Sequence, residues 1–509
     1  MGNGPGAIDQ YEDLVDRYPR LHGGFVWEWR DHGIRTTDAN GKEFFAYGGD
    51  FGEVVHDGNF VMDGMVLSDS TPSPGLFEYK QIVAPLRLGF STETHDDGTR
   101  RSVSVANLRH TADASDVVLR WRTEVDGEVT ASGELDVDSS PGVPLAAGAS
   151  TTIELPDLEA GDAAGEHWLT VEAVLRKDTA WAEAGHVISF AQLDLNNGRH
   201  SVVAPRPLSS VMRAAGHVEG DVALGQARFE EGRLVSLAGL PVSGPRLELW
   251  RAPTDNDCGA GRGSYDLADP WLNNGDGVAA PSLEKVWRDA GLDRLTARVE
   301  KVSASGSGVS VRTRYAAADV AHWITVEEDW QLLDGELFLR VDIVPSAGWD
   351  IIWPRVGVRF DLPASVDGAS WFGAGPRESY PDSMHATQVG RFSAGIDDLA
   401  VTYAKPQETG HRSNVRTLEL GNSGNPWLEI TAIPDSRDRL PGFTLSRHTA
   451  QEVSGAAHPH ELPASRGSYL YLDAAQHGLG SRACGPDVWP QYALRPDART
   501  MTFRFTEAD

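Results

Sequence analysis

The spacing of apolar residues changes near residue 87, and this change constrains the fold more than any other feature of the chain. Before that point apolar residues recur at the intervals that form one face of a helix, whereas beyond it they alternate with polar residues. The first pattern predicts amphipathic helices, and the second predicts strands with one buried face. We therefore expect a short region that contains helices, followed by a long and mostly antiparallel β region.

Length and charge narrow the class of protein. A chain of 509 residues exceeds what one core usually holds, so we expect two or three domains. The 45 Lys and Arg against 74 Asp and Glu give a net charge of -29, which repels nucleic acid phosphates and anionic lipid headgroups. The sequence shows neither an apolar stretch of membrane-spanning length nor a basic and then apolar leader. We expect a cytoplasmic protein with no nucleic acid and no membrane as partner.

Residues with metal-binding chemistry form no convincing pattern. Cys258 and Cys484 are the two cysteines and lie far apart in sequence, so we expect buried free thiols instead of a disulfide framework. The histidines show no ligand spacing such as His-Glu-x-x-His. Asp255–Asp257 resembles a fragment of a calcium loop, but the alternate oxygen ligands and the closing Glu are missing, so a capped turn is predicted.

Residues 1–86 combine helical and apolar segments. Pro5 and Pro19 bound a predicted amphipathic helix, and Pro74 and Pro85 bound a second one. Between them, Leu21–Trp29 is an apolar run with aromatic and β-branched residues, which predicts a buried parallel strand. Helix, buried strand, long loop and helix is the order expected of the end of a (β/α)8 barrel.

The segment 87–204 is predicted to be a small β-sandwich of the immunoglobulin-like type. Leu169–Leu175 alternates in a way that directs one apolar row toward a core. Breaks such as Pro141–Pro144 and Gly161 separate the strands, and the proline-bearing connector Val203–Pro207 marks a domain boundary. Beyond it the alternating runs become longer, as in Leu337–Ile343 and Thr500–Phe505.

Several motifs stand in a fixed order along the chain: Gly23–Trp29, Ala46–Gly52, Phe60–Gly64, Thr179–His186, Arg251–Asp257 and Gly373–Asp382. Together they resemble the large bacterial β-galactosidases of glycoside hydrolase family 2, and the resemblance covers essentially the whole chain. It implies a multidomain, mostly β protein in three parts. These are the end of a (β/α)8 barrel at 1–86, an immunoglobulin-like β-sandwich at 87–204, and a large galactose-mutarotase-like β-sandwich at 205–509.

The resemblance implies a retaining glycosidase that hydrolyses β-D-galactosides such as lactose. Such enzymes need two carboxyl groups about 5–5.5 Å apart. The family places its nucleophile in a Glu-Tyr-x-His-Ala segment shortly before the Met-Gly-Asn with which this sequence opens. We therefore expect that the nucleophile, the acid/base Glu and the Mg2+ ligands lie outside this sequence. No catalytic residue is predicted in this chain, which by itself is expected to be inactive.

Trp27 and Glu28 are the site candidates on the predicted barrel strand. An indole can stack on the apolar face of a pyranose, and the resemblance implies that Trp27 lines the sugar site. Glu28 stands at a strand end, where barrel enzymes place their catalysts. Strand alternation, however, directs its side chain opposite to Trp27. We therefore interpret Glu28 as a structural carboxylate.

Three more site residues follow from the resemblance. The carbonyl of Phe60 and the carboxylate of Asp63 would ligate a Na+ ion that contacts the 6-hydroxyl of the sugar. Phe60 would also bind the substrate, as the counterpart of an aromatic that moves when sugar binds. Some members of the family have Asn at the position of Asp63. Trp489 would reach from the last domain and stack on the leaving-group sugar.

Other interpretations remain open at this level. The chain is either a truncated product or one subunit of a two-chain β-galactosidase, and in both cases its partner is the missing N-terminal part, with a homo-oligomer expected when complete. A non-catalytic carbohydrate-binding β-sandwich protein is the main rival. By analogy of fold alone, His411, Gln407 and Glu408 would suggest mutarotase chemistry, but a fold does not confer an activity.

Overall fold

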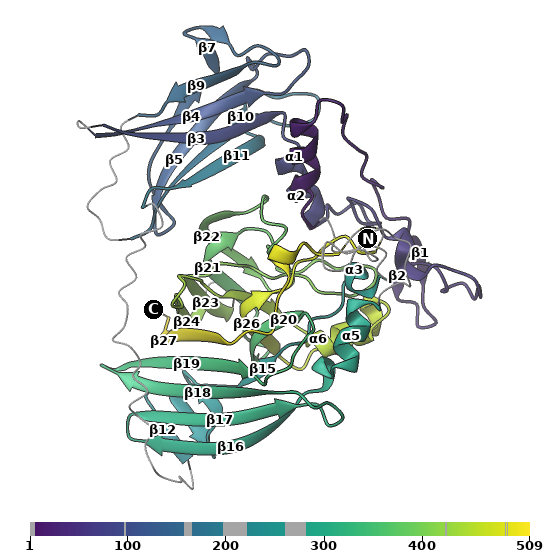
Figure 1. The fold of residues 1–509 in the computed structure, drawn as a ribbon, viewed down its shortest axis with the longest axis vertical. Helices are drawn as coiled ribbons and strands as arrows, with labels where there is room; N and C mark the ends of the chain where they lie inside the picture. The colour runs from purple at the N-terminus through teal and green to yellow at the C-terminus, as the bar shows by residue number, and fades with distance from the viewer. Residues whose placement is uncertain are drawn as a thin grey trace. The chain divides into compact units, whose positions relative to one another are not determined.

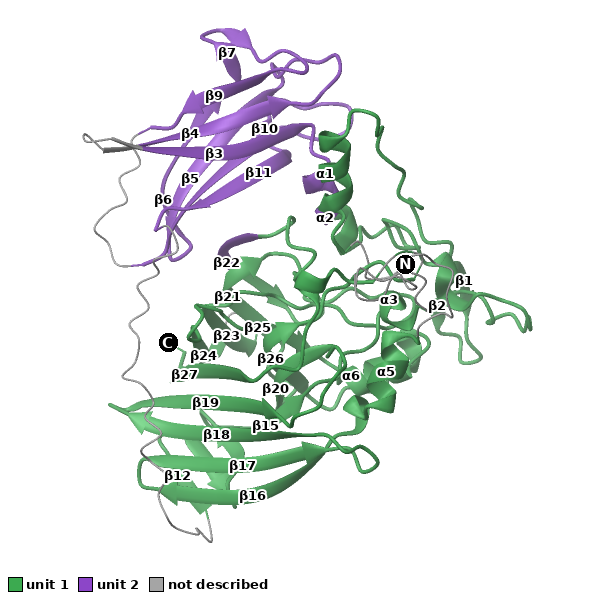
Figure 2. Ribbon diagram, viewed as in Figure 1, with its two compact units in different colours: residues 1–77, 204–387, 392–509 green, residues 78–203, 388–391 purple. Residues whose placement is uncertain are grey.

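The structure is a computed structural model, and it describes residues 6–95, 98–156, 165–196, 221–259, 281–422, 425–483, 485 and 487–508. Pro5, Gly161, the connector Val203–Pro207 and Cys484 lie outside the described residues. The chain forms two compact units (Figure 2). Unit 1 comprises residues 1–77, 204–387 and 392–509, and unit 2 comprises residues 78–203 and 388–391. Each unit has its own hydrophobic core, and the division into three domains stays a prediction.

Unit 2 contains two antiparallel sheets, as the sequence predicts (Figure 1). Among the described residues, the strand orders are β3-β4-β9 and β11-β10-β5-β6. Their bounds are β3 (Leu86–His95), β4 (Gly98–Asn107), β5 (Val117–Val125), β6 (Glu128–Asp136), β9 (Ser150–Glu154), β10 (His167–Leu175) and β11 (Val187–Asp194). A short ribbon pairs β7 (Asp138–Ser140) with β8 (Val143–Pro144).

Strand β10 confirms the predicted alternation and adds one buried polar residue. Leu169, Val171, Ala173 and Leu175 are all buried in the core between the two sheets. Thr170 on the opposite face is buried as well. The reason is tertiary: the Gln192 side chain donates to Thr170 Oγ1 (3.1 Å) and to the carbonyl of residue 389 (2.8 Å), which holds segment 388–391 over this face.

Unit 1 is dominated by two large antiparallel sheets. Among the described residues, one has the order β12-β13-β14-β15-β20-β26-β25 and the other β16-β17-β18-β19-β27-β24-β23-β21-β22. The bounds of the first are β12 (Asp221–Leu224), β13 (Ala227–Glu230), β14 (Arg233–Leu237), β15 (Leu240–Glu248), β20 (Arg355–Leu362), β25 (Gly442–Ser446) and β26 (Ser468–Gln476). Those of the second are β16 (Thr296–Ser305), β17 (Gly308–Ala316), β18 (Trp323–Leu333), β19 (Glu336–Pro345), β21 (Gly368–Gly375), β22 (Gln388–Gly395), β23 (Thr417–Asn422), β24 (Asn425–Ile433) and β27 (Arg499–Glu507).

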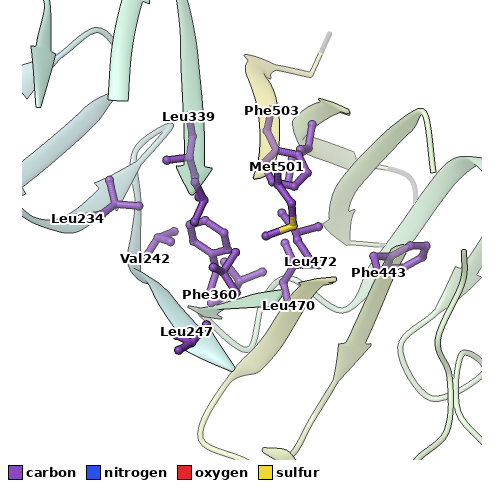
Figure 3. Packing of buried hydrophobic residues seen from close by; sticks show 14 of the residues in the cluster. Leu234, Val242, Leu247, Leu339, Phe360, Phe443, Leu470, Leu472, Met501 and Phe503 are labelled. Atoms are coloured by element: carbon purple, nitrogen blue, oxygen red, sulfur yellow. The ribbon is translucent and has the colours of Figure 1, made fainter. Parts of the chain in front are cut away.

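The core of unit 1 lies between these sheets and follows the predicted period of two. The apolar positions of Leu337–Ile343 in β19 are buried, and so are Met501, Phe503 and Phe505 in β27. Leu339 pairs with Phe503 across the two strands. Figure 3 shows both side chains gathered with residues of the facing sheet, among them Phe360.

The helices are short, and two of them confirm predictions. They are α1 (Asp9–Arg17), α2 (Pro74–Ile82), α3 (Asp255–Cys258), α5 (Leu283–Asp289) and α6 (Ala450–Gly455), with the 3-10 turns η1 (Gly58–Val61), η2 (Leu292–Arg294), η3 (Pro459–Glu461) and η4 (Pro490–Tyr492). Helices α1 and α2 occupy the two segments predicted before residue 87. A hairpin of β1 (Ile34–Thr37) and β2 (Glu43–Ala46) lies between them in sequence. Among the described residues, no helix has the length and apolar character that a membrane crossing requires.

The predicted buried strand at Leu21–Trp29 is wrong. This segment has no regular secondary structure, and its large apolar side chains are exposed. Among the described residues, its neighbourhood contributes one parallel bridge, between Arg30 and Val66. A parallel strand is stabilised by neighbouring strands and by helices on both faces, and an apolar run without them cannot form one.

Candidate functional site

Backbone hydrogen bonds join residues 28–32 to residues 61–66. Glu28 N–H donates to the carbonyl of Asp63 (3.0 Å), and Met65 N–H donates to the carbonyl of Glu28 (2.9 Å). Further along, His32 N–H donates to the carbonyl of Val61 (3.0 Å). The two segments therefore form one ribbon, which brings the backbone around Trp27 next to the turn that carries Phe60 and Asp63.

The aromatic rings on this ribbon are exposed. Trp27 is 77% exposed and Phe60 is 46% exposed. An exposed indole and phenyl ring can each cover the apolar face of a sugar while the hydroxyl groups keep their hydrogen bonds. The structure thus places Trp27, Phe60 and Asp63 on adjoining segments, and it leaves both rings available for stacking.

Glu28 has an ordinary partner in this ribbon. Its carboxylate lies 3.0 Å from His32 Nε2, and both side chains are partly exposed. Such a pair contributes little to stability. The position agrees with a structural role for Glu28, whose charge adds to the larger effect of burial in raising the pKa of Asp63.

Asp63 carries a buried oxygen that lacks a partner among the described residues. Its Oδ1 accepts no hydrogen bond there, and burial raises the pKa of this carboxyl. A buried acceptor of this kind needs a donor, a water molecule or a cation. The described residues contain no group of three or more His, Cys, Asp or Glu that could hold a metal ion. Asp63 therefore fits a cation only as one ligand beside backbone carbonyls such as that of Phe60.

Asp31 holds the turn that contains Asp63 and Gly64, and this residue was not predicted from the sequence. The residue is 7% exposed, and its Oδ1 accepts a hydrogen bond from Gly64 N–H at 2.8 Å. A Cβ atom at position 64 would lie 2.1 Å from the backbone nitrogen of Asp31, so only glycine fits this close approach. Gly64 in the Asp-Gly pair was the one sequence signal for this contact.

The Asp31 carboxyl should make the stability of unit 1 depend on pH. Burial raises its pKa to about 6, above the ordinary value of about 4. The folded state therefore holds this proton more tightly, so stability falls as pH rises from about 4 to about 6 and then levels off. Asp31→Asn keeps the acceptor for Gly64 and removes the charge. The free energy of unfolding of this variant, measured with urea, should exceed that of the parent. We expect the difference to grow across that pH range to at most about 3 kcal/mol.

Asp57→Asn is the matched control for this measurement, because Asp57 is an exposed carboxyl directly before the turn η1. Its unfolding free energy should follow the parent at every pH. Parallel curves for Asp31→Asn and the parent would show that Asp31 does not titrate differently in the folded state.

Trp489 lies beside the first helix. It lines a cavity of about 120 Å³ together with Tyr11 and Leu14 of α1. Among the described residues, the lining of this cavity includes neither Trp27 nor Phe60 nor Asp63. The structure thus brings the three ribbon residues together and places Trp489 in a separate cavity.

The Asp255–Asp257 segment is the capped turn that the sequence predicts. Thr254 and Asp257 form a capping box at the start of α3, with Thr254 Oγ1 accepting from Asp257 N–H and Asp257 accepting from Thr254 N–H. Asp257 also binds the Arg251 guanidinium through two hydrogen bonds of 3.0 and 2.7 Å. Both side chains are buried.

His411 belongs to a closed polar cluster. Its Nδ1 lies 3.3 Å from Asp473, which also binds Arg355 at 2.7 Å. Glu408 lies 3.8 Å from the same arginine. All four side chains are buried. A catalytic acid or base must reach its substrate, and these groups face one another instead of an opening.

Family models match three parts of the chain. They are described as "Beta galactosidase small chain" for residues 225–506, "Glycosyl hydrolases family 2, TIM barrel domain" for residues 1–88, and "Beta-galactosidase, domain 4" for residues 103–196. The chain belongs to the β-galactosidases of glycoside hydrolase family 2. A curated β-galactosidase from Arthrobacter sp. (strain B7) is 64% identical over 508 residues, which make up 100% of this chain and 49% of the relative. The chain therefore spans about half the length of that relative.

Solved structures resemble parts of the chain only distantly. A galactose mutarotase related enzyme from Lactobacillus acidophilus has 12% identity and a TM-score of 0.29, covering 57% of this chain and 98% of the other. A galactose mutarotase-like protein from Clostridium acetobutylicum has 7% identity and a TM-score of 0.28, covering 57% and 94%.

Proposed function

We propose that this chain is the carboxyl-terminal part of a retaining β-galactosidase that hydrolyses terminal β-D-galactosides such as lactose. The observation that carries the proposal is the 64% identity to a β-galactosidase along the whole chain. In the retaining mechanism one carboxyl group protonates the glycosidic oxygen, and a second forms a galactosyl ester that water then cleaves. Both groups would come from polypeptide outside this sequence.

The chain would supply the wall of the sugar site. Trp27 would stack on the galactose ring and Phe60 would cover its edge, since both rings are exposed on adjoining segments. The backbone ribbon between residues 28–32 and 61–66 would keep the segments that carry the two rings next to each other. Trp489 would contact the leaving-group sugar, which requires its loop to face the completed pocket.

The apolar surface around this wall supports a polypeptide partner. Phe25 and Trp29, which flank Trp27 in sequence, are exposed large hydrophobic residues, and so are Val54 and Val55 in the loop before η1. Apolar surface of this extent is characteristic of an interface. The remainder of the (β/α)8 barrel would cover it, either in one longer chain or as a complementary subunit, and the complete enzyme would form a homo-oligomer.

We propose a Na+ ion at the Phe60 carbonyl and Asp63, because Asp63 Oδ1 is a buried oxygen without a hydrogen-bond donor among the described residues. A bound Na+ would bind the oxygen of the sugar's 6-hydroxyl group. Mg2+ would be held by ligands outside this sequence. In the assembled enzyme, Asp63→Ala should abolish the response of the KM for lactose to added Na+, measured against K+ at constant ionic strength. A parent KM that ignores Na+ would contradict this site.

The stereochemistry of the product tests the proposed function. The assay uses this chain assembled with the part of the Arthrobacter enzyme that it does not span. Proton NMR of lactose hydrolysis should show β-galactose first and its α anomer only later, as a retaining double displacement requires. Appearance of α-galactose first would contradict the mechanism. Tight galactose binding by this chain alone in isothermal titration would instead favour a binding protein.

A further inference from the structure

We infer that helix α3 is a positioning element that holds the turn with Phe60 and the loop with Trp489 in a fixed relation. The inference rests on the proposed function, because it assigns roles at the same sugar site. Helix α3 is only four residues long, but its successive side chains bind three different segments of unit 1.

The first side chain of α3 binds the sugar-side turn. Asn59 Nδ2 donates a hydrogen bond of 2.6 Å to Asp255 Oδ1, across 196 residues of sequence. Asn59 directly precedes Phe60 in η1, so this contact fixes the turn one residue from the proposed stacking ring. A hydrogen bond to a charged acceptor is stronger than a neutral one, and the Asp255 side chain is 11% exposed.

Gln407 holds Asp255 from the other side. Its Nε2 lies 3.4 Å from Asp255 Oδ2, and its Oε1 accepts from Asp255 N–H at 3.3 Å. Gln407 itself is buried. The carboxylate of Asp255 is therefore oriented by a second residue, which makes it a fixed support for the Asn59 amide.

The second side chain of α3 binds the Trp489 side. Asn256 is buried, its Nδ2 donates to the carbonyl of Gly480 (2.9 Å), and its Oδ1 accepts from Ala483 N–H (3.1 Å). Gly480 in turn packs closely against Val488, where an added Cβ would lie 2.8 Å from the valine side chain. Val488 directly precedes Trp489. The Asn256 amide, by binding Gly480, therefore also restrains the backbone next to Trp489.

The third side chain anchors the helix. Asp257, which forms the capping box with Thr254, also makes a buried ion pair with Arg251, and Arg251 donates to the carbonyls of residues 477 and 478 (2.8 and 3.1 Å). Helix α3 thus cannot shift without breaking buried charge-assisted hydrogen bonds. A displacement of about 1 Å in a substrate-positioning group can cost about 100-fold in rate, so a rigid link between the two sides has a direct catalytic consequence.

We call the contact of Asp255 with Asn59 the sugar-side arm of α3, and the contact of Asn256 with residues 480 and 483 the Trp489-side arm. Kinetics of the assembled enzyme distinguish the two arms. Asp255→Ala and Asn59→Ala should each weaken competitive inhibition by galactose about 10-fold and lower kcat/KM for lactose and for nitrophenyl galactoside alike. The double variant should be no worse than either single one, since both remove the same contact. Asp255→Asn keeps an acceptor for Asn59 and should restore most of the activity.

Asn256→Ala should give a different pattern. It should lower kcat/KM for lactose more than for nitrophenyl galactoside and should reduce galactosyl transfer to glucose, while galactose inhibition stays unchanged. We expect the same pattern from Trp489→Ala. Equal losses on all substrates in both arms would overturn the inference. If Asn256→Ala does not fold, two variants still test the sugar-side arm. Asn59→Ala should lose kcat/KM and galactose inhibition, whereas Asp255→Asn should retain most of the activity.

Hydrogen exchange on this chain tests the same link without relying on activity. Asp255→Ala should accelerate amide exchange in residues 58–64, while Lys285→Ala, an exposed substitution on the neighbouring helix α5, should not. Faster exchange with an inactive assembled parent would reject the proposed function and keep the positioning role. Unchanged exchange in residues 58–64 would overturn the positioning role whatever the activity.

Discussion

Asp257→Ala should lower the free energy of unfolding of unit 1 by about 3–5 kcal/mol. The substitution removes the partner of Arg251, which is fully buried and binds Asp257 through two hydrogen bonds of 3.0 and 2.7 Å. It also removes the acceptor for Thr254 N–H at the start of α3. An uncompensated buried guanidinium is far more costly than the loss of an exposed pair, because water cannot replace the carboxylate.

Urea unfolding at neutral pH measures this effect. The matched control is Asp289→Ala, which removes the exposed ion pair with Lys285 at 2.8 Å and should change the unfolding free energy by less than about 1 kcal/mol. Asp257→Asn keeps one acceptor and should fall between the two. A loss for Asp257→Ala as small as that of the control would show that the Arg251 charge is solvated, contrary to the structure.

Trp27→Ala should reduce kcat/KM of the assembled enzyme for lactose by about 30- to 150-fold, which corresponds to about 2–3 kcal/mol of transition-state binding. The indole is 77% exposed in this chain, so the folded structure depends little on it. Its apolar face is then available to a sugar ring, and the alanine variant loses that contact while it keeps the ribbon. Trp27→Phe should retain part of the activity.

Trp181→Ala controls for the general effect of removing an exposed tryptophan. Trp181 is 67% exposed in unit 2, where it packs edge-on against His186, and its replacement should leave kcat/KM unchanged. Thermal unfolding should confirm that both variants fold as the parent does. A Trp27→Ala enzyme with the kcat/KM of Trp181→Ala would remove Trp27 from the sugar site.

The sequence predicted those parts of the fold that local pattern determines. The alternation at Leu337–Ile343 identified a strand and its buried face, because side-chain direction in a strand depends only on position along it. The apolar run Leu21–Trp29 predicted a buried segment. A parallel strand also requires neighbouring strands, and the sequence of the run alone does not show whether they are present. Thr170 shows the same limit, since a segment far along the chain buries it.

The site divides in the same way. Trp27, Phe60, Asp63 and Trp489 were found through motifs that resemble a family, and no periodicity would have selected them. The contact between Asn59 and Asp255 crosses 196 residues, so only the tertiary structure reveals it. The one sequence signal of the Asp31 contact is Gly64, because the backbone of Asp31 leaves no room for a side chain at position 64.

Turnover of nitrophenyl β-D-galactoside by the purified chain tests the central claim most directly, namely that this chain forms the wall of a sugar site whose reactive carboxyl groups lie on other polypeptide. We expect no hydrolysis above the buffer rate from the chain alone. Addition of the part of the relative that the chain does not span should produce turnover. Hydrolysis by the chain alone at the ordinary enzyme rate of about 10 per second would contradict the claim.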